Sequence, residues 1–196
     1  MRIISGKARS IRLQAPPGSG LRPTEDRVKE ALFAILGDLR DKNVLDLFAG
    51  SGALGLEALS RGAGTVFMLE KNPAHVLCME KNLAAVRKAI GPDCGQVKIV
   101  TADAQHTSRV LSDWSGKFAV ILADPPYNPP PGAFGGAALL QQPEFAAWAG
   151  TDCLLVLEHQ YGEELPLFPH SPWHLLRQKR FGIRALSFLS QKNEPS

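Results

Sequence analysis

The four residues Asp124-Pro125-Pro126-Tyr127 carry the most specific chemistry in this sequence of 196 residues. An exocyclic amine on a nucleic-acid base is a poor nucleophile, because its lone pair is delocalised into the ring. Acceptors at its N–H groups localise that lone pair, and the Asp124 carboxylate and the Pro125 carbonyl could both accept. The prolines stiffen the turn, while Tyr127 offers a face on which a base can stack. Alone, the tetrapeptide also fits a proline turn with no chemical role after a strand. The residues at the other predicted strand ends distinguish between these two interpretations.

A glycine-rich turn lies earlier in the chain, between a predicted strand and a predicted helix. Gly50, Gly52 and Gly55 satisfy the G-x-G-x-x-G spacing. Glycines let the backbone turn sharply and approach a ligand closely. Glu70 stands at the end of the next predicted strand, where its carboxylate can accept both hydroxyls of a ribose. The pattern predicts either a dinucleotide or S-adenosylmethionine.

Two further acids favour S-adenosylmethionine. Asp46 precedes the turn, within the end of the strand. A carboxylate there suits the ammonium group and water network of a methionine moiety, and it would be poorly placed beside a pyrophosphate. Asp103 follows the third predicted strand and could accept from an adenine amino group, although it is an equally good helix N-cap.

Short apolar runs alternate with helical stretches along most of the chain, which predicts an α/β fold with a doubly wound, mostly parallel sheet. The predicted strands are 44–48, 65–69, 97–100, 118–123, 153–158, 173–181 and 184–190, and the predicted helices are 25–37, 54–60, 73–89, 104–112 and 137–148. The last two strands follow each other directly, so we expect an antiparallel hairpin at one edge. Such sheets bind ligands at the carboxyl ends of their strands.

The charge is unevenly distributed. Residues 1–23 and residues 165–193 each contain five cations and no acid, which leaves 12 basic and 19 acidic residues elsewhere. A mildly acidic body with two basic ends suggests contact with a polyanion, although basic ends also serve solubility. Residues 2–14 alternate loosely and predict a short basic hairpin or arm, followed by a loop at 15–20.

Length and composition exclude several classes of protein. A chain of 196 residues fits one domain with a small extra element. No apolar run approaches the ~20 residues that cross a bilayer, and the basic start is not followed by a signal core, so we expect a cytoplasmic protein. The three cysteines and five histidines form no metal-type cluster, so no metal site is expected.

The sequence resembles a known family at several points. Residues 44–55 resemble motif I of the class I, Rossmann-like methyltransferases, and residues 124–127 resemble their amino-methylating motif IV. The closer resemblance is to the RsmD family, which makes N2-methylguanine in 16S ribosomal RNA. It is carried by residues 2–7, 21–33 and 52–62.

This resemblance implies a seven-stranded sheet with an N-terminal hairpin, and a substrate presented within the 30S ribosomal subunit. It also implies that Arg22 and Thr24 lie over the cofactor pocket, with Thr24 reaching the cofactor carboxylate.

These observations predict an enzyme that transfers a methyl group from S-adenosylmethionine to guanine N2 in 16S rRNA. We expect a basic arm at residues 1–20, a methyltransferase domain at 21–192 and a monomer. The residues expected to act are Asp124, Pro125 and Tyr127 in catalysis, Arg22, Thr24, Asp46, Gly50, Gly52, Glu70 and Asp103 in cofactor binding, and Arg2, Lys7, Arg9 and Arg12 in contact with RNA.

Four other functions are compatible with parts of the pattern. A DNA adenine-N6 methyltransferase uses the same tetrapeptide, but 196 residues leave little room for a target-recognition domain. A protein-glutamine methyltransferase commonly has Asn where Asp124 stands. A nicotinamide-dependent oxidoreductase leaves residues 124–127 unexplained. A non-catalytic RNA-binding protein on the same fold leaves the full set of strand-end residues unexplained.

Overall fold

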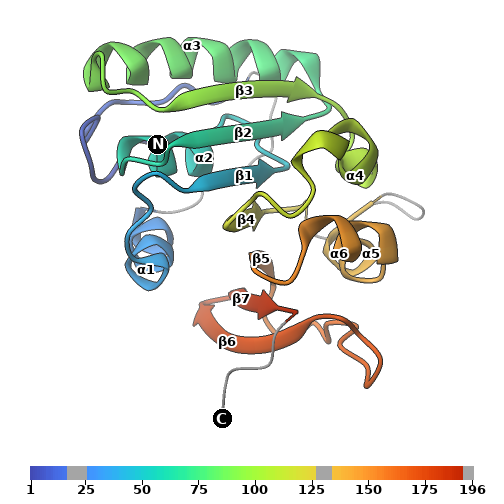
Figure 1. Ribbon diagram of the computed structural model, residues 1–196. Helices are drawn as coiled ribbons and strands as arrows, with labels where there is room; N and C mark the ends of the chain where they lie inside the picture. The colour runs from blue at the N-terminus through green and yellow to red at the C-terminus, as the bar shows by residue number, and fades with distance from the viewer. Residues whose placement is uncertain (17–25, 127–133, 192–196) are drawn as a thin grey trace. The chain divides into compact units, whose positions relative to one another are not determined.

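The computed structural model describes residues 1–16, 26–126 and 134–191 (Figure 1). The chain divides into two compact units, Met1–Ala102 and Asp103–Ser196. The described residues hold seven strands with helices between them, in both parallel and antiparallel pairs, which confirms the predicted α/β fold. The expected boundaries of the arm and the domain, at residues 20 and 192, lie outside the described residues.

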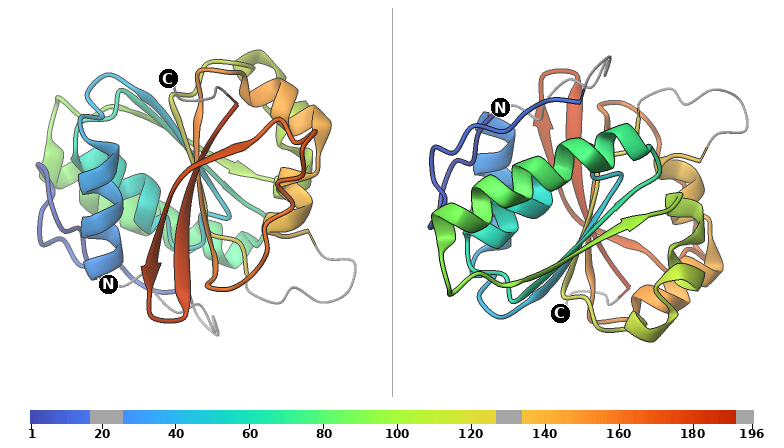
Figure 2. Two further views of the ribbon diagram at one scale, coloured as in Figure 1. Left: turned by 90° about the horizontal axis from the view of Figure 1, so that it is seen from below. Right: turned by 90° about the horizontal axis from the view of Figure 1, so that it is seen from above.

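The first unit is a three-stranded parallel sheet covered by helices. Its elements are α1 (Asp26–Leu36), β1 (Asn43–Leu47), α2 (Ala53–Ser60), β2 (Thr65–Glu70), α3 (Pro73–Ile90) and β3 (Gln96–Thr101). The central strand β2 pairs in parallel with both β1 and β3. Helix α2 packs on β1 and β2, and α3 packs beside α2 and on β2 and β3 (Figure 2). The buried runs in β1 and β2 reflect strands that are covered on both faces.

The second unit combines two parallel strands with an antiparallel hairpin. Its elements are the 3-10 helix η1 (Ala104–His106), α4 (Thr107–Val110), the 3-10 helix η2 (Ser112–Trp114), β4 (Val120–Ala123), α5 (Gly136–Leu140), α6 (Pro143–Ala149), β5 (Leu154–Gln160), β6 (His174–Phe181) and β7 (Arg184–Ser190). Strand β4 runs parallel to β5, and β7 lies antiparallel to both β5 and β6. The hairpin β6–β7 is long and strongly twisted, and its prediction is confirmed (Figure 2).

Two predicted helices are wrong, and each is broken for a local reason. The single helix expected at 137–148 is two helices, because Pro143 begins α6 and cannot continue the hydrogen bonding of α5. The helix expected at 104–112 is three short helical segments. Within it the Thr107 hydroxyl donates to the Ala104 carbonyl (2.6 Å), a side-chain bond that competes with regular helical hydrogen bonding.

The N-terminal arm is a short hairpin held on the first unit. Arg2 and Arg12 form an antiparallel bridge, and the Ile3 amide donates to the Ile11 carbonyl over 2.9 Å. Ile3 and Leu13 are buried, so the arm contributes apolar side chains to the core of this unit. The predicted basic hairpin is therefore confirmed, as a packed element with a single bridge.

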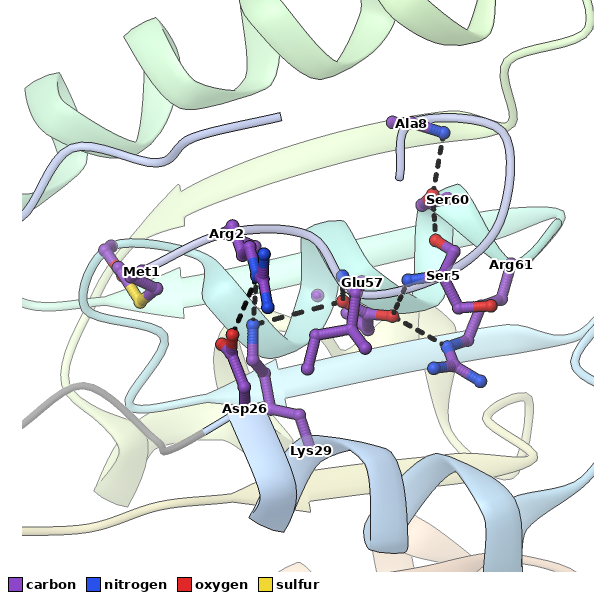
Figure 3. Close-up of polar contacts among 12 residues, drawn as sticks. Met1, Arg2, Ser5, Ala8, Asp26, Lys29, Glu57, Ser60 and Arg61 are labelled. Carbon is purple, nitrogen blue, oxygen red and sulfur yellow. Dashed lines mark hydrogen bonds and ion pairs between the residues drawn. The ribbon is translucent and has the colours of Figure 1, made fainter. Parts of the chain in front are cut away.

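Glu57 on α2 fixes the arm to the unit (Figure 3). Its buried carboxylate accepts from the amides of Ile4 (2.8 Å) and Ser5 (3.1 Å) and from the Arg61 guanidinium (2.8 Å). The ammonium of Lys29 lies 4.0 Å from the same carboxylate and donates to the Arg2 carbonyl. Burial lowers the pKa of Lys29, and the adjacent Glu57 carboxylate opposes that shift. One buried carboxylate therefore joins the arm, α1 and α2.

We predict that Glu57→Ala destabilises the protein by roughly 3–5 kcal/mol, because it leaves the buried Lys29 charge without its carboxylate partner and the part-buried amides of Ile4 and Ser5 without their acceptor. Urea unfolding followed by circular dichroism measures the change. Asp93→Asn is the control, since Asp93 pairs with Lys7 at an exposed site and its loss leaves the midpoint unchanged. Equal midpoints for the two variants would contradict the role given to Glu57.

Candidate active site

The glycine turn after β1 is shaped by close packing. Gly50 and Gly52 have φ angles of 55° and 79°, which favour glycine. A Cβ added at Gly52 would lie 2.8 Å from Met79 Cγ, and one added at Gly55 would lie 2.7 Å from Met68 Cγ. The methionines behind the turn therefore require glycine at both positions, a constraint that the sequence pattern did not reveal.

The Asp46 carboxylate ties β1 to the start of α2. Its Oδ2 accepts from the Gly55 amide over 2.8 Å, and the residue is almost fully buried. Burial raises the pKa of Asp46 to about 7, and the negative charge of Glu70 acts in the same direction. The structure thus gives Asp46 a role in holding the turn. Its predicted contact with the cofactor ammonium stays a prediction.

Glu70, at the end of β2, holds the other side of the same turn. Its Oε2 accepts from the Gly50 amide (2.9 Å) and its Oε1 from the Asn72 amide (2.8 Å). His75 Nδ1 lies 3.6 Å from Oε1. A carboxylate oxygen carries more than one lone pair, so these bonds leave acceptor capacity for a ribose hydroxyl. The predicted ribose contact stays a prediction.

Asp103 and the tetrapeptide belong to the second unit. Asp103 accepts from the Gln105 amide (3.1 Å) and caps η1, which confirms its interpretation as an N-cap. Asp124 directly follows β4 and is partly exposed, whereas Pro125 is buried. A Cβ added at Gly136, the first residue of α5, would lie 3.4 Å from Pro125 Cγ, so α5 begins against this turn.

Three predicted site residues, Arg22, Thr24 and Tyr127, lie outside the described residues. Two further residues beside the glycine turn were not predicted. Ser51 is buried within the turn, and the buried Asn82 on α3 donates to the Ser51 carbonyl (2.9 Å). A polar residue within the apolar stripe of α3 is the signal that could have identified Asn82.

The four cations assigned to RNA differ in their surroundings. Arg2 pairs with Asp26 and Lys7 with Asp93, each over 2.8 Å. Arg9 and Arg12 are exposed and form no ion pair with any residue that the structure describes. Two of the four positive charges are therefore partly neutralised within the protein, and the other two are available to a polyanion.

The carboxylates at the glycine turn suit a cationic ligand. Asp46 and Glu70 place two of them beside a turn whose glycines let a ligand approach the backbone closely. S-adenosylmethionine carries an ammonium and a sulfonium, and its ribose offers two hydroxyls to a carboxylate.

Among the described residues no cluster of three ligating side chains could hold a metal ion. Within the same residues, no helix is both long and apolar enough to cross a membrane.

Known proteins are similar over nearly the whole chain. The family model described as Conserved hypothetical protein 95 matches residues 1–190. Ribosomal RNA small subunit methyltransferase D of Escherichia coli K12 is 34% identical over 187 residues, which cover 93% of this chain and 85% of the relative. The protein of that name from Haemophilus influenzae is 31% identical, covering 93% and 90%. The solved structure of YhhF from Escherichia coli has a TM-score of 0.74 at 34% identity and covers 97% of both chains.

The fold and the glycine turn define an S-adenosylmethionine-dependent methyltransferase of the Rossmann-like class. Within that class, the chain belongs to the Conserved hypothetical protein 95 family, which is the RsmD family identified from the sequence.

We predict that stability falls as pH rises because of Asp46. A carboxyl whose pKa is raised from 3.8 to about 7 binds its proton more tightly in the folded state, so its contribution is complete below pH ~4 and is lost through pH 7. Between pH 5 and pH 8 the wild type should lose about 2–3 kcal/mol of stability relative to Asp46→Asn. Urea unfolding at each pH measures this difference, and parallel curves for the two proteins would contradict it.

Proposed function

We propose that this chain transfers a methyl group from S-adenosylmethionine to the exocyclic N2 of a guanine in 16S rRNA of the 30S subunit, acting as a monomer in the cytoplasm. The observation that carries the proposal is the position of Asp124 and the buried Pro125, which follow β4 directly. The chain belongs to a family whose relatives are named for ribosomal RNA methylation. The two exposed arginines of the arm, Arg9 and Arg12, support an RNA substrate.

The cofactor side of the reaction is assigned to the first unit and to Asp103, the first residue of the second unit. Gly50 and Gly52 would let the backbone approach the cofactor, and Glu70 would accept its ribose hydroxyls. Asp46 would lie toward the methionine end and Asp103 toward the adenine. The family resemblance adds Arg22 and Thr24 over the pocket.

The amine side is assigned to Asp124 and Pro125. When bound, the cofactor supplies an electrophilic methyl group on a positively charged sulfur. The Asp124 carboxylate and the Pro125 carbonyl would accept hydrogen bonds from the two N–H groups of the guanine amine. The lone pair of the amine nitrogen would then point at the methyl carbon. Tyr127 would stack on the base once it leaves its helix.

No strong base is needed for this step. The amine becomes positively charged as the C–N bond forms and the bond from the methyl carbon to sulfur breaks, which leaves S-adenosylhomocysteine. A cationic amine loses its proton readily to a nearby carboxylate or to water. Positioning of two bound reactants then supplies most of the rate enhancement. The protein must therefore hold acceptors in fixed places, which two consecutive prolines achieve at low entropic cost.

We predict that Asp124→Ala lowers methyl transfer at least ~100-fold, as expected for loss of an oriented polar group at the reacting centre. Binding of S-adenosylhomocysteine should stay at the wild-type level, because Asp124 is assigned to the amine. Transfer of labelled methyl and equilibrium dialysis measure the two effects. Asp113→Ala removes an exposed carboxylate of η2 and should change neither. Parallel loss of cofactor binding in Asp124→Ala would contradict these roles.

We predict that the double variant Arg9→Ala/Arg12→Ala binds substrate RNA more weakly and with less sensitivity to salt. Each lost phosphate contact reduces the slope of log K against log salt concentration by roughly 0.7–0.9. Filter binding at several salt concentrations measures the slope. A charge-matched control removes Arg109 and Lys117, two exposed cations of the second unit. An unchanged affinity and slope in the arm variant would exclude the arm as an RNA contact.

A further inference from the structure

The base of the arm is hydrogen-bonded to the cofactor turn through one side chain. Asn82 lies on α3 and is almost fully buried. Its Oδ1 accepts from the Gln14 amide (2.8 Å), and its Nδ2 donates to the Gln14 carbonyl (3.0 Å). The same Nδ2 donates to the carbonyl of Ser51 (2.9 Å), the residue between Gly50 and Gly52.

The other end of the arm reaches the same residue. The Ser51 hydroxyl contacts the Met1 sulfur over 3.6 Å, and the Met1 carbonyl accepts from the Leu13 amide over 3.1 Å. Met1 and Gln14 lie at the two ends of the hairpin. Met1 contacts Ser51 directly, and Gln14 is connected to Ser51 through the hydrogen bonds of Asn82. A displacement of the arm must be transmitted to the glycine turn or break these bonds.

A side-chain amide meets the chemical demands at this position. The side chain must accept from one amide and donate to two carbonyls, which uses both Nδ2 hydrogens and one oxygen lone pair. Aspartate cannot donate, and an aliphatic residue can neither donate nor accept. Because the Asn82 amide is fully bonded, its burial costs little, and an apolar residue there would leave the Gln14 amide and the Ser51 carbonyl without these bonds.

We propose that Asn82 is a positioning residue that couples RNA binding on the arm to cofactor binding at the glycine turn. The inference rests on the proposed function, since it needs RNA on Arg9 and Arg12 and the cofactor at Gly50 and Gly52. RNA bound to Arg9 and Arg12 restrains the arm further, and through Gln14 and Asn82 it restrains Ser51. The restrained turn loses less conformational freedom when the cofactor binds, so each ligand tightens the binding of the other by the same factor.

The test measures that factor directly. Labelled S-adenosylhomocysteine, which has no methyl group to transfer, is bound by equilibrium dialysis with and without small subunits from cells lacking the modification. The wild type should bind it at least about fivefold more tightly with subunits present. In Asn82→Ala the ratio of the two dissociation constants should fall to about one. If Asn82 had a purely structural role, Asn82→Ala would raise both dissociation constants and leave their ratio unchanged.

Cys78→Ala is the matched control. The Cys78 thiol also donates to the Gln14 carbonyl (3.3 Å) from α3, but it is not bonded to Ser51, so this variant should keep the wild-type ratio. Should Asn82→Ala fail to fold, Gln14→Pro removes the amide donor from the exposed side of the same link, and it should lower the ratio as well.

The outcomes separate the two claims. A wild type that binds both ligands independently, or an Asn82→Ala protein that keeps the wild-type ratio, overturns the coupling and leaves the proposed function intact. A wild type that binds no subunits, or no S-adenosylhomocysteine, contradicts the proposed function and the coupling with it.

Discussion

The buried carboxylates of Asp46 and Glu70 accept hydrogen bonds from backbone amides and so hold the glycine turn. The arrangement of the first unit depends on these bonds. Asp46 bonds the Gly55 amide and Glu70 bonds the Gly50 amide, so the ends of β1 and β2 and the start of α2 are fixed together. Backbone amides at such a turn need acceptors when they are buried. Supplying them as carboxylates concentrates negative charge at the proposed site of a cationic cofactor, and the raised pKa of Asp46 is a consequence of this burial.

Helix α2 transmits this constraint to the N-terminal arm. The helix begins at the glycine turn and carries Glu57 and Ser60, which accept from amides of the arm. Gly6 illustrates how tight the contact is, since a Cβ there would lie 1.9 Å from the Ser60 carbonyl oxygen. The arm is therefore held on the first unit by backbone hydrogen bonds and close packing against α2. A substrate held by Arg9 and Arg12 would be positioned relative to that unit by backbone hydrogen bonds.

The sequence predicted the strands well because continuous apolar runs and the glycine spacing are local signals. It also placed Asp124 after a strand and Asp103 at a helix start, since both depend on neighbouring residues. It failed where a partner distant in sequence decides. Nothing near Glu57 indicates that its carboxylate binds the arm, and nothing near Asn82 indicates Gln14 or Ser51. The paired states of Arg2 and Lys7 were unpredictable for the same reason.

The measurement that tests the central claim most directly is transfer of a labelled methyl group from S-adenosylmethionine to three acceptors. These are small ribosomal subunits from cells lacking the modification, naked 16S rRNA and unmethylated duplex DNA. The account predicts label in the subunits, recovered as N2-methylguanosine after digestion. Label found only in DNA, as N6-methyladenine, would contradict the RNA substrate. Label in none of the three, by a protein that binds S-adenosylhomocysteine, would contradict the assignment of Asp124 to a base amine.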